Sequence, residues 1–236
     1  MRKERATIPC RDGSSEAYLK RIDYHIPFYP DTFYHIYNRG NNSGDIFFTE
    51  KHYSYFLKKW KEYLGSVLEV YAYCLLPNHF HFLVKTKGNE SDTILQRDTI
   101  PQRDGISSDY YYEVILENKL RRMLQSFSQA INKDVKRTGS LFQKRYKRLM
   151  VKDENYLQWL TYYIHKNPFH HGYVNDLSLW KYSSFNTIRD TIPSRDGISG
   201  LVKVDDLISF FGNRKNFLEF HNQTKMSTDI EHLTLE

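Results

Sequence analysis

Two histidines two positions apart, His79 and His81, are the residues of this sequence whose types and spacing best suit chemistry. They lie in a hydrophobic run that predicts a β-strand from 79 to 85. Alternate residues of a strand share a face, so both imidazoles are expected on one face, with Phe80 and Phe82 on the other. Two neighbouring imidazoles form a two-point metal site. The alternative, which the spacing leaves open, is a pair of packed core histidines.

A helix expected from Asp153 to about Lys166 supplies further candidates. Tyr163 and Asn167 are four residues apart and share a helical face, whereas Tyr162 lies about 100° around the axis. An amide oxygen is a hard ligand that completes a site for Mg²⁺ or Mn²⁺ with two imidazoles. A tyrosine one turn away then attacks a metal-polarised phosphodiester. The alternative is that Tyr163 is one of 19 tyrosines and only packs.

The elements that must position these residues alternate between strand and helix patterns. Hydrophobic periodicity predicts a further strand at 34–38, one at 67–76 that pairs with 79–85, and a helix after Thr49. A long helix is expected over 112–136 and stops at Gly139, and a basic strand is expected over 141–151. The helix from Asp153 is expected to end at Asn167 and Pro168, and 201–221 predicts one further helix or two.

The composition limits the class of protein. The chain has 236 residues and a formal net charge of +6, and 16% of its residues are aromatic. Its longest apolar stretch, near 70–77, is too short to span a membrane, so we expect no membrane partner. Two cysteines cannot form a disulfide framework, which favours the cytoplasm. Basic charge interleaved with aromatic rings suits a nucleic-acid partner.

A basic surface is predicted from cations that cluster between the long helix and the next strand, with Arg39, in the turn after the first strand, as a separate candidate. Cations bind phosphates, although a solvated face is the alternative. The candidates for DNA contact are Arg39, Lys133, Lys136, Arg137, Lys144, Arg145, Lys147 and Arg148.

Two segments resemble the motifs of a known family. The sequence Tyr73-x-Cys-Leu-Leu-Pro-Asn-His-Phe-His-Phe-Leu-Val is similar to the strand motif of the single-tyrosine HUH transposases. The segments Leu-Phe-Gln-Lys-Arg-Tyr146 and Tyr163-Ile-His-Lys-Asn-Pro168, followed by Gly172, resemble the second signature of the REP-associated tyrosine transposases. The match covers about 33–185 in consistent order, and the joint pattern is far more specific than either motif.

The resemblance implies a fold and a set of roles. The fold is α+β and ferredoxin-like, with a central antiparallel sheet and helices packed on it. His79 and His81 become the metal-binding pair, Asn167 the third ligand of a divalent metal ion, Mg²⁺ or Mn²⁺, and Tyr163 the nucleophile. The reaction is cleavage and rejoining of single-stranded DNA at hairpin elements through a 5′-phosphotyrosine intermediate. We expect a monomer, with a dimer as the alternative.

Two other functions stay open. One is a catalytically silent protein that binds hairpin DNA, and the other is a metal-dependent phosphodiesterase that uses water. We expect an N-terminal tail at 1–30, a catalytic domain at 31–186 with a loop insertion at about 88–110, and a C-terminal appendage at 187–236.

A short phrase, Thr-Ile-Pro-x-Arg-Asp-Gly, recurs at 7–13, 99–105 and 191–197. Its residue types predict a turn or loop at each copy. The codons of Ile-Pro-Ser and Asp-Gly-Ile can be reverse complements, so a DNA hairpin can encode the copy at 192–198. We therefore hypothesise that palindromic elements inserted into the reading frame, and reading the gene would test this.

Overall fold

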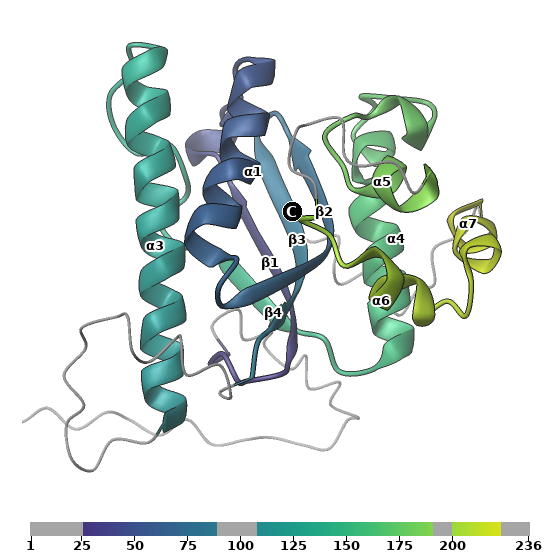
Figure 1. Ribbon diagram of the computed structural model, residues 1–236. Coiled ribbons are helices and arrows are strands. Elements are labelled where there is room, and N and C mark those ends of the chain that lie inside the picture. The colour runs from purple at the N-terminus through teal and green to yellow at the C-terminus, as the bar shows by residue number, and fades with distance from the viewer. Residues whose placement is uncertain (1–25, 89–107, 191–199, 223–236) are drawn as a thin grey trace, which may run out of the picture.

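The computed structural model describes residues 26–88, 108–190 and 200–222 (Figure 1). Within these ranges no helix is both long and apolar enough to cross a membrane. All three copies of the repeated phrase lie outside the described residues. The division of the chain into tail, catalytic domain and appendage stays a prediction.

Four strands form one antiparallel sheet: β1 (Phe33–Arg39), β2 (Leu68–Leu76), β3 (His79–Thr86) and β4 (Lys147–Met150). They lie in the order β2-β3-β1-β4, and each neighbouring pair is antiparallel. Helix α1 (Glu50–Leu64) connects β1 to β2, and α3 (Ser108–Asp134) lies between β3 and β4 in the chain. A βαββαβ order with β1 and β3 at the centre is the ferredoxin-like arrangement, so the expected α+β fold is confirmed.

Helices α1 and α3 cover one face of the sheet (Figure 1). Their hydrophobic residues recur at helical spacing, so each helix buries a single stripe. Trp60 of α1 stacks on Phe82 of β3 with ring centroids 3.7 Å apart, and Phe56 meets Phe127 of α3 at 4.9 Å. These aromatic contacts hold α1 against β3 and α3 against α1, and they leave the opposite face of the sheet to another element.

Helix α4 (Glu154–His170) packs on the other face, against β2 and β3. It begins at Asp153, whose side chain accepts a hydrogen bond from the Tyr156 backbone N–H at 2.8 Å, as expected for an N-cap. Around it, on the same side of the sheet, lie η2 (Leu177–Leu179), α5 (Phe185–Asp190), α6 (Val204–Ser209) and α7 (Arg214–Asn222) (Figure 1). The short η1 (Asn41–Ser43) follows β1.

Two expected boundaries are wrong. Helix α4 does not end at Asn167 but continues to His170, because the N–H groups beyond Pro168 still find carbonyl partners: His171 donates to Asn167 and Tyr173 to Pro168. The basic strand expected over 141–151 is confined to β4, since the chain before it contacts β1 only at isolated positions, such as the bond from the Gln143 N–H to the Arg39 carbonyl.

Candidate active site

Strand β3 places His79 and His81 on the sheet face that α4 covers. The alternate residues Phe80 and Phe82 enter the core under α1 and α3, as strand alternation predicts. The two imidazole rings lie 5.1 Å apart with their planes at 89°, and only 2% and 1% of these residues is exposed. Strand β1 runs beside them and pairs Arg39 with His79. The histidine pair is therefore a buried, rigidly held feature of the sheet.

The turn before β3 fixes the orientation of His79. Asn78 Nδ2 donates to the Ser43 carbonyl at 3.3 Å, which leaves Asn78 Oδ1 2.6 Å from His79 Nδ1. An amide oxygen only accepts, so Nδ1 of His79 carries the hydrogen and Nε2 of the neutral ring keeps its lone pair. The Gly40 N–H donates to the Asn78 carbonyl at 2.7 Å, and a Cβ at Gly40 would lie only 1.8 Å from the Gly44 carbonyl oxygen.

Helix α4 presents Tyr163 and Asn167 to the histidines from one face. Oδ1 of Asn167 lies 3.0 Å from Nε2 of His79, and the Tyr163 ring meets the His81 ring edge to face at 5.6 Å. Tyr163 and Asn167 are as buried as the histidines, with 3% and 1% exposed. The structure thus brings all four residues that the sequence singled out into one cluster between β3 and α4.

The neighbouring candidates on α4 point away from this cluster. Tyr162 packs against Trp159 at 5.7 Å and against Phe220 of α7 at 6.1 Å. His165 bonds through Nδ1 to Nε2 of His221 at 2.9 Å. The rotation of about 100° per residue in a helix therefore separates Tyr162 from the histidine pair.

The donor atoms of the cluster fit a divalent cation. Nε2 of His79 and Oδ1 of Asn167 are both lone-pair atoms, and at 3.0 Å they repel each other unless a proton or a cation lies between them. Two imidazole nitrogens with one amide oxygen form a mixed donor set of the kind that binds divalent cations. Among the described residues no three His, Cys, Asp or Glu side chains are grouped to hold a metal ion. The Asn167 amide is therefore needed as the third donor.

Sequence reasoning missed His35 of β1. Its Nε2 lies 2.9 Å from Nδ1 of His81, its ring stacks on Tyr37 with centroids 4.6 Å apart, and only 1% of the residue is exposed. A signal was present, because His35 and Tyr37 alternate within an expected strand and so share a face. Which face they share depends on the pairing of β1 with β3, which periodicity alone does not give.

Two of the eight cations proposed for DNA contact lie on the face of the histidine pair. Arg39 pairs with His79 across the sheet, and Lys147 of β4 pairs with Tyr37. Nζ of Lys147 is 5.5 Å from the centroid of the Tyr37 ring, which in turn stacks on His81 at 5.5 Å. Arg39 and Lys147 therefore place positive charge on the sheet face that carries the cluster.

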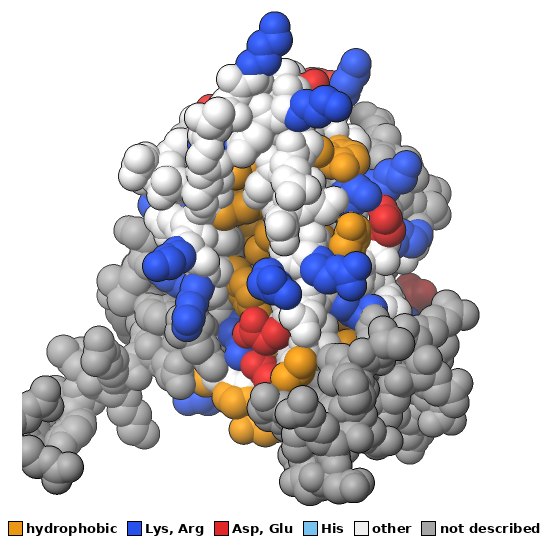
Figure 2. All heavy atoms as spheres, turned by 90° about the vertical axis from the view of Figure 1, so that its left-hand side faces the viewer, with side chains coloured by type: hydrophobic (Ala, Val, Ile, Leu, Met, Phe, Trp, Pro, Cys, Tyr) orange, Lys and Arg blue, Asp and Glu red, His pale blue; other side chains and the backbone are white. Residues whose placement is uncertain are grey.

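Lys144 and Arg145 lie elsewhere, on a groove beside α3. Both are exposed, and with Arg121 and Phe142 they line a groove of about 690 Å³ between α3 and the segment before β4. Figure 2 shows hydrophobic side chains on this face between flanking Lys and Arg side chains. Lys133, in the last turn of α3, and Lys136, just after the helix, are exposed, whereas the following Arg137 is half-buried.

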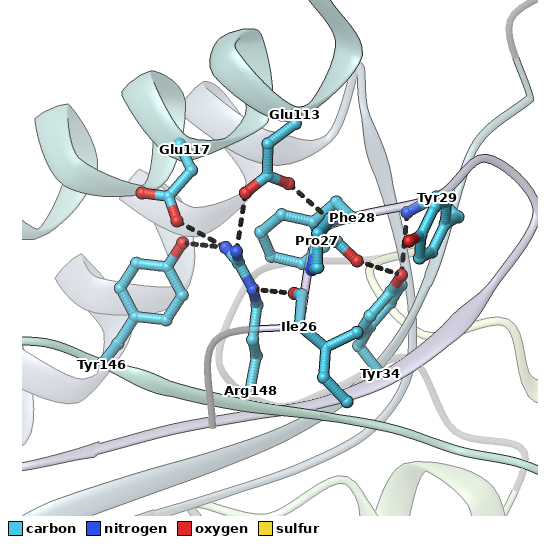
Figure 3. A network of polar contacts seen from close by, with 9 residues as sticks. All are labelled: Ile26, Pro27, Phe28, Tyr29, Tyr34, Glu113, Glu117, Tyr146 and Arg148. Atoms are coloured by element: carbon cyan, nitrogen blue, oxygen red, sulfur yellow. Dashed lines mark hydrogen bonds and ion pairs between the residues drawn. The ribbon is translucent and has the colours of Figure 1, made fainter. Parts of the chain in front are cut away.

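Arg148 is not part of an exposed basic surface, so this expectation is corrected. Only 3% of the residue is exposed, and its guanidinium bonds to Glu113 at 2.6 Å and to Glu117 at 2.5 Å (Figure 3). It also donates to the hydroxyl of Tyr146 and lies 4.2 Å from the Phe28 ring centroid. Because β4 alternates, Lys147 faces the cluster while Arg148 faces α3, where two carboxylates neutralise its charge.

Exposed aromatic rings lie at the C-terminal end of α4. Phe169 and Tyr173 are 45% and 43% exposed. The His171 ring lies 4.9 Å from that of His79 and 6.5 Å from that of Tyr173. Burial raises the pKa of Tyr173, and the positive charge of Arg39 partly offsets this. Rings and a cation therefore lie at the rim of the cluster.

A ferredoxin-like sheet that presents two histidines to a helix carrying tyrosine and asparagine has the architecture implied by the single-tyrosine HUH motifs. The resemblance to the REP-associated tyrosine transposases is confirmed by a curated relative from Haemophilus influenzae named "Putative REP-associated tyrosine transposase". It is 26% identical over 118 residues, which cover 50% of this chain and 59% of the relative. The match thus spans only about three fifths of the relative's length.

A solved structure of a REP-associated tyrosine transposase bound to a REP hairpin superposes with a TM-score of 0.49 and 18% sequence identity, over 78% of this chain and 89% of that one. None of the established protein-family profiles matches the sequence.

Proposed function

We propose that this protein is a metal-dependent enzyme that cleaves and rejoins single-stranded DNA at hairpin elements through a phosphotyrosine intermediate. One observation carries the proposal: a tyrosine, an asparagine and two histidines converge in a single buried cluster in which His79 Nε2 lies 3.0 Å from Asn167 Oδ1. The relative's name, a transposase, supports the same class of reaction.

His79, His81 and Asn167 are the residues that would hold the metal ion. A divalent ion bound there would act as a Lewis acid that polarises the scissile phosphate and stabilises the charge of the transition state. The protein supplies two donor atoms with fixed directions, because Asn78 orients His79 and helix α4 orients Asn167. Such a rigid first coordination sphere limits the reorganisation needed during the reaction.

Tyr163 is the proposed nucleophile. Its phenolic oxygen forms a bond to phosphorus while the bond from phosphorus to the 3′-oxygen of the preceding nucleotide breaks. The phenol gives up one proton and the 3′-oxygen takes up one, so the step is balanced. The phosphotyrosine keeps the energy of the broken bond, and a 3′-OH therefore reverses the reaction without a nucleotide cofactor.

Cations and rings around the cluster suit a single strand. Arg39 and Lys147 on the same sheet face provide phosphate contacts, and the exposed rings of Phe169 and Tyr173 provide stacking surfaces for unpaired bases. A flexible single strand also reaches a nucleophile that is 3% exposed more readily than a rigid duplex does. The groove lined by Lys144 is a surface for the phosphates of a hairpin stem.

One chain supplies every member of the cluster, which supports a monomeric active form. Light scattering of the purified protein at micromolar concentration should therefore give the mass of one chain, about 28.3 kDa.

Incubation with a hairpin-bearing single strand and Mn²⁺ tests the proposal. We expect a covalent protein–DNA adduct that Tyr163→Phe abolishes and Tyr162→Phe retains, since Tyr162 faces α7. Hairpin binding without cleavage under any metal would instead indicate a catalytically silent DNA-binding protein. Cleavage without an adduct would indicate a phosphodiesterase that uses water.

A further inference from the structure

His35 forms a contact that the proposed reaction has not used. It lies on β1, two residues from Tyr37, and its Nε2 is 2.9 Å from Nδ1 of His81. The two rings are nearly parallel, with centroids 5.1 Å apart and 21° between planes. Both residues are 1% exposed, so bulk water does not compete for this hydrogen bond.

The contact decides which nitrogen of His81 is available to a metal ion. In a hydrogen bond between two neutral imidazoles, one nitrogen donates and the other accepts. If His35 donates, His81 accepts at Nδ1 and carries its hydrogen on Nε2, where no lone pair remains. If His81 donates from Nδ1, its Nε2 keeps the lone pair that a metal ion requires.

His79 is held in the matching tautomer by a different partner. Its Nδ1 lies 2.6 Å from Asn78 Oδ1, which only accepts, so its Nε2 is the lone-pair atom facing Asn167. A site that uses both histidines therefore needs a hydrogen-bond acceptor at Nδ1 of each ring. Asn78 meets this need for one ring, and His35 is the group placed to meet it for the other.

His35 is placed as a partner of a ligand rather than as a ligand. In the part of the chain that the structure describes, no three His, Cys, Asp or Glu side chains are grouped to hold one metal ion, so His35, His79 and His81 do not form a three-imidazole site. The stacking of His35 on Tyr37, at 4.6 Å and 21°, fixes its ring plane.

We propose that His35 is a positioning residue that accepts a hydrogen bond from Nδ1–H of His81 and so keeps the Nε2 lone pair of His81 available for the metal ion. This inference rests on the metal site of the proposed function, but not on DNA cleavage. Outer partners of this kind commonly change metal affinity by about 10- to 100-fold.

Metal binding by three variants tests the role, measured in a Tyr163→Phe background without DNA. Titration with Mn²⁺ followed by electron paramagnetic resonance gives the Kd at one fixed pH near 7.5. We expect His35→Leu to raise the Kd about 10- to 100-fold, because the acceptor is lost. His35→Gln, whose amide oxygen still accepts, should restore much of the affinity. His170→Leu, at an exposed position on the same helix as Asn167, should bind as the parent does.

Nitrogen-15 spectra of the imidazoles supply a readout that does not depend on the stability of any variant. In the unsubstituted protein, with and without Mg²⁺, we expect His81 to carry its hydrogen on Nδ1. A hydrogen on Nε2 of His81, or equal Mn²⁺ affinity in His35→Leu and the parent, would overturn the proposal. Failure of DNA cleavage with the expected tautomer and affinities would refute the proposed reaction alone.

Discussion

A buried chain of hydrogen bonds predicts how the stability of this fold depends on pH. Nδ1 of His221 donates to the Phe217 carbonyl, Nε2 of His221 accepts from Nδ1 of His165, and Nε2 of His165 accepts from the hydroxyl of Ser184. All the members are buried, and the chain ties α7 to α4 and to Ser184, which directly precedes α5. Each neutral imidazole has both nitrogens satisfied, so protonation of either one breaks the chain.

The pKa of His221 gives the size of the effect. It falls from 6.5 to about 4, chiefly because burial lowers it; the hydrogen bond to the Phe217 carbonyl raises it in part, and the nearby charge of Lys166 lowers it. Burial also holds the pKa of His165 well below its usual range. The unfolded chain therefore binds more protons below pH 6.5 than the folded protein does. The stability from His221 is complete above pH 6.5 and is lost as the pH falls towards 4, by about 3 kcal/mol in total.

The substitution His221→Gln tests this reasoning, because the glutamine oxygen can still accept from His165 but does not titrate. The assay is urea unfolding followed by circular dichroism at several values between pH 7.5 and pH 4. The loss in free energy of unfolding across this range should be smaller in the variant, by about 3 kcal/mol. His171→Gln removes an exposed imidazole and serves as the control. Parallel pH dependences for His221→Gln and the parent would refute the assignment.

Three further predictions concern the buried Arg148, the cations of the groove beside α3, and the exposed ring of Tyr173. Arg148→Ala should lower the free energy of unfolding by about 3 kcal/mol in urea titrations, because the carboxylates of Glu113 and Glu117 lose their shared partner. An unchanged midpoint of unfolding would argue against the buried network. Replacing Lys144 and Arg145 by Gln should reduce the slope of log affinity for a hairpin stem against log salt by about 2, with cleavage chemistry intact; an unaltered slope would exclude the groove. Tyr173→Leu should weaken binding of a single strand about 5- to 150-fold and Tyr173→Phe much less, measured by fluorescence anisotropy; equal losses in both would exclude stacking.

Local patterns were enough to predict the elements that carry the cluster. Alternation in the strand at 79–85 gave the shared face of His79 and His81, and helical spacing gave that of Tyr163 and Asn167. Both shared faces depend only on residues a few positions apart in the chain, and both are present in the structure. The end of α4 was misplaced, because a proline in the last turn costs little once the N–H groups after it have partners.

Features that depend on pairing between distant strands could not be predicted in this way. Alternation sends the adjacent cations Lys147 and Arg148 to opposite faces, but only the pairing of β4 with β1 decides which of them faces the cluster. His35 becomes part of the site only because β1 lies antiparallel beside β3. Periodicity identifies a strand and its two faces, but neither its neighbours nor its register.

Mapping the covalent adduct by mass spectrometry tests the central claim most directly. After reaction with a hairpin-bearing strand and Mn²⁺, trypsin should release the peptide from Asp153 to Lys166, which contains both Tyr162 and Tyr163. Fragmentation should place a 5′-phosphonucleotide on Tyr163. A modification on Tyr162 or on a residue outside this peptide, or cleaved DNA without any modified peptide, would contradict the account.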